Sequence, residues 1–118
     1  MYINILSVVR YEDFCLEPFS RGKSLFSFLG LGMTSSTRQF LTRHTDSKIK
    51  DQSRYSTYRD TQGNILKWTK RMKFEDIQDI QNKCATAMKL WGYKPLASEE
   101  DLAKELTVED VLAPLTLR

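Results

Sequence analysis

Apolar and polar positions divide the first part of the chain into a strand-like stretch followed by a helical one. Residues 3–11 are rich in Ile, Leu and Val, which predicts a buried strand. A strand that is apolar on both faces is typical of a parallel sheet covered by helices. Residues 20–31 follow Pro18 and carry an apolar stripe that ends at Gly30 or Gly32, which predicts a helix. The order strand, turn, helix predicts an α/β fold built on half a βαβ unit.

The clearest helical pattern extends from residue 73 or 74 to residue 90 or 91. Gly92 is a natural C-terminal cap for this helix, and Pro95 prevents its continuation. Apolar residues recur at intervals of three and four, so we expect them on one buried face. They are Ile77, Ile80, Cys84, Met88 and Trp91.

Polar residues fill the interval between the two apolar halves. Hydroxyl side chains at residues 34–37 offer N-caps for a short helix over residues 38–43. Residues 45–64 show no sustained periodicity, which predicts a long loop, and loops of this length are often functional. We therefore expect one or two parallel strands, three or more helices and a long basic loop.

Charge is unevenly placed along the chain, although the net charge is only +3. Residues 98–118 carry a net charge of −4, and their weak capping-box spacings predict one or two short helices. Residues 38–73 contain ten Lys or Arg against three Asp. A basic segment of this kind attracts nucleotides, sulfated sugars, nucleic acid or anionic lipids. The same charges would equally suit a solvated surface that binds nothing.

Composition excludes several classes of protein. No apolar stretch approaches the ~20 residues of a transmembrane helix, and the first residues do not resemble a signal peptide. Cys15 and Cys84 are too few to build a disulfide scaffold. Because His44 is the only histidine, a multi-histidine metal site is excluded, and we expect His44 at the surface or at a helix cap. No glycine-rich phosphate loop and no catalytic arrangement are visible.

The phrase Val-Arg-Tyr-Glu-Asp-Phe at residues 9–14 closes the predicted strand, and Phe-Leu-Gly-Leu at residues 28–31 ends the next helix. Together they resemble the C-terminal half of sulfotransferases, which transfer a sulfuryl group from 3′-phosphoadenosine 5′-phosphosulfate (PAPS). The order of the pieces over residues 3–96 is similar to that of the Golgi carbohydrate sulfotransferases. The pieces that continue this resemblance are Phe40-Leu41, His44-Thr45, Trp68, Cys84, Met88, Leu90, Gly92 and Tyr93.

The resemblance implies a set of donor-binding residues. Tyr11 and Thr45 would line the adenine pocket, and Gly63 would keep the close backbone approach of the family's Arg-Lys-Gly triplet. Thr-Gln replaces the cations of that triplet, so the available substitutes are Arg59 and Lys67. Trp68 has cations beside it and would close the pocket wall. Alternatively, Trp68 packs against the next helix as a hydrophobic staple.

The family's phosphosulfate loop, with its Arg-Ser-Gly-Ser-like residues, is expected more than one hundred residues upstream and is not found in this chain. We therefore expect residues 1–97 to form the C-terminal part of a sulfotransferase domain, followed by an acidic helical tail at residues 98–118. The chain alone is expected to be inactive, with no catalytic residue and no metal. The resemblance implies PAPS as donor, a glycan as acceptor and a Golgi location, with no nucleic acid partner and no membrane segment.

Two other functions fit the same sequence. The basic region could form a non-catalytic module that binds sulfated glycans or nucleic acid. The chain could also be a structural or degenerate protein, because half of a parallel sheet leaves apolar strand faces exposed.

Overall fold

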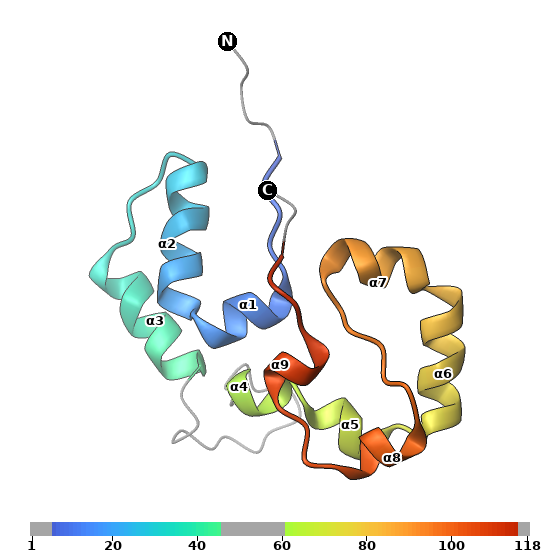
Figure 1. Cartoon of the computed structure of the whole chain (residues 1–118). Helices are drawn as coiled ribbons and strands as arrows, with labels where there is room; N and C mark the ends of the chain where they lie inside the picture. The colour runs from blue at the N-terminus through green and yellow to red at the C-terminus, as the bar shows by residue number, and fades with distance from the viewer. Residues whose placement is uncertain (1–5, 46–60, 116–118) are drawn as a thin grey trace. The chain divides into compact units, whose positions relative to one another are not determined.

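The computed structural model describes residues 6–45 and 61–115 and divides the chain into two compact units, Met1–Asn64 and Ile65–Arg118. The described residues of both units are mainly helical (Figure 1). In the first unit the helices are α1 (Tyr11–Leu16), α2 (Pro18–Phe28), α3 (Ser35–Thr45) and α4 (Thr61–Asn64). In the second unit they are α5 (Lys67–Arg71), α6 (Phe74–Lys83), α7 (Ala85–Trp91), α8 (Glu99–Ala103) and α9 (Val108–Val111).

The strand predicted over residues 3–11 is not seen in its described part. Residues 6–10 have no strand pairing, and the chain enters α1 at Tyr11. A strand needs a neighbouring strand for its N–H and C=O groups, and residues 6–45 and 61–115 contain no parallel pair. Glu12 and Asp13 lie in the first turn of α1, where carboxylates favour a helix. The predicted parallel sheet is therefore absent from the part of the chain that the structure describes.

α2 and α3 form a helical hairpin in the first unit, and α1 also packs against α2 (Figure 1). Gly22 is buried in α2, and a methyl group there would lie 3.1 Å from Met33 Cε and 3.3 Å from Leu41 Cδ1. The same point lies 3.9 Å from Phe14 Cε2 in α1. The absence of a side chain at this position therefore lets the three helices approach closely.

Both ends of the α2–α3 connection follow local rules. Gly30 has a φ of 72°, and the N–H groups of Gly30 and Leu31 donate to the carbonyl oxygens of Ser27 and Phe26 at 3.0 and 2.8 Å. These two bonds are the Schellman arrangement that ends a helix, as the glycine predicted. At the start of α3, the Thr37 N–H donates to Thr34 Oγ1 at 3.2 Å, so one of the expected hydroxyl caps is formed.

The predicted loop over residues 45–64 lies largely outside the described residues. At its two ends the structure corrects the prediction, because Thr45 belongs to α3 and residues 61–64 form α4. α4 packs against α1. The Thr61 hydroxyl donates to the Cys15 carbonyl oxygen, and the Gln62 amide donates to the Leu16 carbonyl oxygen, each at 3.4 Å. These bonds satisfy carbonyl groups that the end of α1 leaves free.

The long helix predicted over residues 73/74–90/91 is divided at Cys84 into α6 and α7. Of its expected core face, Ile77 is buried, whereas Ile80, Cys84 and Trp91 are exposed. Cys84 was expected to be a small core residue, and this expectation is wrong. A helical stripe is buried only where another element covers it, so periodicity alone did not decide these positions. At the break, the Cys84 backbone (φ −110°, ψ 16°) departs from α-helical geometry.

The second unit is closed by contacts between its middle and its end. Tyr93 and Leu112 form an antiparallel bridge, in which the Lys94 N–H donates to Val111 O at 2.8 Å and the Ala113 N–H donates to Gly92 O at 2.7 Å. The acidic residues between them contain α8 and α9, as their capping signals predicted. The buried apolar side chains of this unit are Ile65, Ile77, Leu96, Val111 and Leu112.

Candidate functional site

Tyr11 occupies the first position of α1 and remains 58% exposed. Its hydroxyl group reaches the Cys15 thiol and the Asn64 side chain. The hydrogen bond with Cys15 raises the pKa of Tyr11, and partial burial raises it further. The phenol is therefore neutral at physiological pH, and its tethered hydroxyl leaves much of the side chain open to a ligand.

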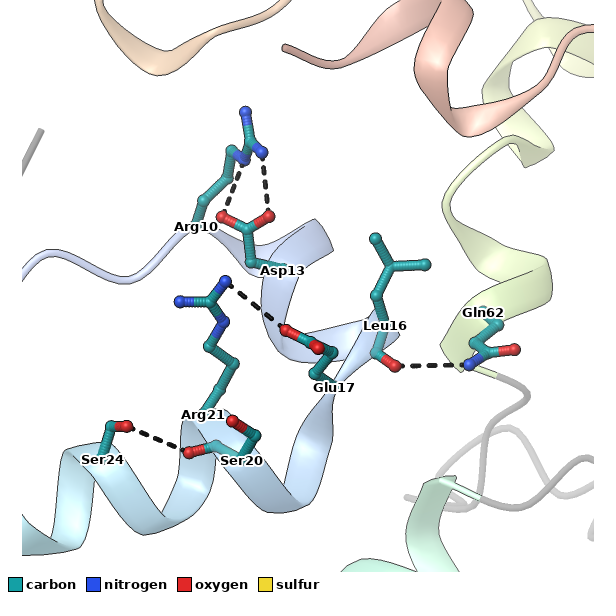
Figure 2. A network of polar contacts seen from close by, with 8 residues as sticks. All are labelled: Arg10, Asp13, Leu16, Glu17, Ser20, Arg21, Ser24 and Gln62. Atoms are coloured by element: carbon teal, nitrogen blue, oxygen red, sulfur yellow. Dashed lines mark hydrogen bonds and ion pairs between the residues drawn. The ribbon is translucent and has the colours of Figure 1, made fainter. Parts of the chain in front are cut away.

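Thr61, Gln62 and Gly63, which the resemblance aligns with the family's Arg-Lys-Gly triplet, lie in α4, immediately before Asn64. The side chains of Thr61 and Gln62 bond to the last carbonyl groups of α1, as described above. Figure 2 shows the Gln62 amide directed at the Leu16 carbonyl oxygen. Gly63 is exposed and directly precedes Asn64. The structure thus brings Tyr11 and the Gly63 segment together within the first unit.

Thr45 is the last residue of α3 and is half-buried. Its hydroxyl donates to the Leu41 carbonyl oxygen at 2.7 Å, so the proton is committed while the oxygen can still accept a hydrogen bond. α3 and α1 both pack against α2. Thr45 and Tyr11 are therefore carried by two helices of the same packed unit.

Lys67 and Trp68 belong to the second unit, where both lie in α5. Trp68 is half-buried, whereas Lys67, Lys70 and Arg71 are exposed. The Trp68 indole therefore lies among cations within one short helix. Arg59, the other expected cation, lies outside the described residues.

A buried ion pair that was not predicted from the sequence lies at the start of α1. Arg10 is only 4% exposed, and its guanidinium donates to both carboxylate oxygens of Asp13, at 2.8 and 3.1 Å (Figure 2). Bidentate pairs of this geometry are among the strongest charged hydrogen bonds. The signal available in the sequence was opposite charges three residues apart at a helix start.

Two other residues considered for chemistry, His44 and Cys15, lie in the helices that carry Thr45 and Tyr11. His44, expected at a surface or cap, is half-buried in the last turn of α3, and its ring stacks on Phe40 with centroids 3.9 Å apart. Cys15 is buried in α1. Within residues 6–45 and 61–115, no three His, Cys, Asp or Glu side chains are grouped to hold a metal ion. No helix in that part of the chain is long and apolar enough to cross a bilayer.

Comparison with known proteins gives consistent relatives. The chain is 31% identical over 96 residues to carbohydrate sulfotransferase 3 of Tetronarce californica, covering 81% of this chain and 22% of that protein. It is 29% identical to human carbohydrate sulfotransferase 1, covering 80% of this chain and 23% of the relative. Human carbohydrate sulfotransferase 6 is also 29% identical, with 80% and 25% covered. No protein-family model and no solved structure matches the chain.

These matches confirm the resemblance that the sequence analysis stated. They extend over about four fifths of this chain, which spans about a fifth to a quarter of the length of the relatives. The chain is therefore a relative of the carbohydrate sulfotransferases, corresponding to a limited part of such a protein.

Proposed function

We propose that this chain forms part of a Golgi sulfotransferase that moves a sulfuryl group from PAPS to a carbohydrate hydroxyl. The observation that carries the proposal is the similarity to three carbohydrate sulfotransferases over about four fifths of the chain. Because the chain spans about a fifth to a quarter of those proteins, the complete reaction is proposed for the longer enzyme. The residues of this chain supply donor-binding groups.

The adenine end of the donor would be held in the first unit. The exposed Tyr11 ring offers an aromatic surface for the purine, and the Thr45 hydroxyl oxygen offers an acceptor for a hydrogen bond. Gly63 adds an exposed stretch of backbone without a side chain, which suits close approach of a phosphate. The packing of α4, which contains Gly63, against α1, which begins at Tyr11, supports a shared role.

The resemblance also implies Arg59 and Lys67 as cations for the phosphate groups of the donor and Trp68 as a residue of the pocket wall. Lys67 is exposed, and Trp68 lies beside it in α5. PAPS supplies an activated sulfuryl group when bound, and electrostatic stabilisation accounts for most catalysis in transfers of this type. The residues of this chain bind and orient the donor, and we propose that they do not transfer the group without the family's phosphosulfate loop.

Titration of the full chain with adenosine 3′,5′-bisphosphate, with binding measured by calorimetry, tests this function. We expect saturable binding that Tyr11→Ala weakens roughly fivefold through loss of the aromatic surface, whereas Tyr11→Phe retains most of it. Phe19→Ala is a matched control, because Phe19 is also an exposed aromatic residue of the first unit. Absence of saturable binding, even after fusion to the N-terminal half of a related enzyme, would refute the proposed donor site.

A further inference from the structure

One face of α3 presents an aromatic and basic surface that the proposed donor site does not use. Phe40 is 57% exposed, and the His44 ring lies against it with an interplanar angle of 21°. Arg43 is exposed and lies three positions after Phe40, so the two side chains are neighbours on the helix surface. We call Phe40, Arg43 and His44 the α3 ledge.

The α3 ledge faces away from the residue of α3 assigned to the donor. Five positions separate Phe40 from Thr45, which is a rotation of about 140° around the helix. Thr45 is half-buried and bonds back to the Leu41 carbonyl oxygen, whereas Phe40 points outward. A ligand on the α3 ledge is therefore separate from a nucleotide that contacts Thr45.

The chemistry of the α3 ledge combines an apolar ring face with a fork of hydrogen-bond donors. His44 stacks on Phe40 without hiding it, so the phenyl ring keeps accessible surface. The Arg43 guanidinium can pair with a sulfate or carboxylate through two parallel hydrogen bonds. α3 contains Arg38 and Arg43 but no acidic residue, so nothing on the helix itself opposes an anion.

We infer that the α3 ledge binds a sulfated sugar chain, with a sugar ring on Phe40 and an anionic group on Arg43. A pyranose has one face of C–H groups that packs on an aromatic ring, and its sulfate groups project from the edge. Both features are matched by neighbouring positions on one helical turn. A duplex nucleic acid fits less well, because its phosphates require a longer basic stripe than one arginine on this face provides. The inference rests on the proposed function, since the sugar chain would be the acceptor or its sulfated product.

Binding of the full chain to a heparin oligosaccharide tests the α3 ledge, with poly(vinyl sulfate) as a polyanion that has sulfates but no sugar rings. Phe40→Ala is expected to weaken heparin binding roughly fivefold while leaving poly(vinyl sulfate) binding unchanged. Phe40→Tyr keeps the ring and should retain heparin binding. Arg43→Gln is expected to weaken both ligands roughly fivefold.

Two matched variants separate the α3 ledge from general charge and general apolar surface. Arg38→Gln removes a cation that lies about 160° around the same helix from Phe40 and about 140° from Arg43. Phe28→Ala removes an exposed phenyl ring from α2. Both should bind heparin within about twofold of the unchanged protein, because surface changes away from a site have small effects. Circular dichroism spectra of all variants establish that each remains folded.

Equal losses of heparin affinity for Arg38→Gln and Arg43→Gln would overturn the inference. Heparin binding that does not depend on Phe40 would also overturn it, as would Phe40-dependent binding of duplex DNA that is tighter than the binding of heparin. Titration of the same samples with adenosine 3′,5′-bisphosphate distinguishes failure of the α3 ledge from failure of the proposed donor site. Phe40-dependent heparin binding without nucleotide binding would refute the donor site alone. Nucleotide binding with Phe40-independent heparin binding would refute the α3 ledge alone.

Discussion

The guanidinium of Arg10 holds both carboxylate oxygens of Asp13 while its own side chain is almost completely buried. Arg10 and Asp13 lie on either side of Tyr11 in the sequence, and their ion pair fixes the point at which the extended chain enters α1. Two charges removed from water are tolerated only when they satisfy one another. The start of α1, and with it the position of Tyr11, therefore depends on this ion pair.

Replacing Asp13 by Asn is expected to destabilise the first unit by about 3 kcal/mol, because it breaks a bidentate ion pair whose guanidinium is almost fully buried. Urea unfolding measures the loss. Asp79→Asn is the control, since the Asp79–Lys83 pair is exposed and should contribute less than about 1 kcal/mol. Equal effects of the two substitutions would contradict the role given to the buried pair.

Gln81 of α6 forms two hydrogen bonds with the segment that follows α7, and we expect these bonds to stabilise the second unit. Its amide donates to Leu96 O at 3.0 Å and its oxygen accepts from Leu96 N at 2.7 Å, across 15 positions of sequence. Because Leu96 is 7% exposed, Gln81→Ala leaves both backbone groups with little access to water and should cost about 2 kcal/mol. Hydrogen exchange at the Leu96 amide should accelerate. Gln78→Ala, at an exposed position of the same helix, should leave that exchange rate unchanged.

The two cysteines are expected to differ sharply in reactivity toward a thiol reagent. Burial raises the pKa of the Cys15 thiol, although the hydrogen bond with Tyr11 opposes part of that rise. Cys15 is 1% exposed, whereas Cys84 is exposed. Since the thiolate is the reactive form, the Cys84 thiol should react fast, whereas the Cys15 thiol should react only on unfolding. Cys84→Ser should remove the fast phase and Cys15→Ser should leave it, and the reverse pattern would contradict the structure.

Asp110 is expected to make the stability of the second unit depend on acid pH. The Thr107 N–H donates to its carboxylate at 2.8 Å and lowers the pKa of Asp110. The folded state then prefers the ionised carboxylate, so this stabilisation is present above about pH 4 and is lost as the pH falls through the lowered pKa. Asp110→Asn should lower the melting temperature at neutral pH and have a smaller effect in acid.

Glu109→Gln is the matched control for this pH dependence, because Glu109 is an exposed acid of the same helix. Its melting temperature should follow that of the unchanged protein at each pH. A constant difference between Asp110→Asn and the unchanged protein from neutral to acid pH would contradict a role for the ionised carboxylate.

The sequence by itself determined the features that depend on a few neighbouring residues. Thr34 caps α3, Gly30 and Gly92 end their helices with a φ of 72°, and Thr107 and Asp110 pair at the start of α9. Each signal acts within one turn, so no distant partner is needed. The order of short motifs also gave the relationship to the carbohydrate sulfotransferases, which the comparisons bear out.

Only the tertiary structure decided which apolar and polar groups have partners far along the chain. Residues 6–10 were predicted to be part of a strand, but no strand pairs with them within residues 6–45 and 61–115. Ile80 and Trp91 belong to the predicted core face, yet both are exposed. The hydrogen bond from the Thr61 hydroxyl to the Cys15 carbonyl oxygen joins groups 46 positions apart, which no local spacing connects. A sequence pattern states which face a residue occupies, whereas burial and pairing depend on what the folded chain places against that face.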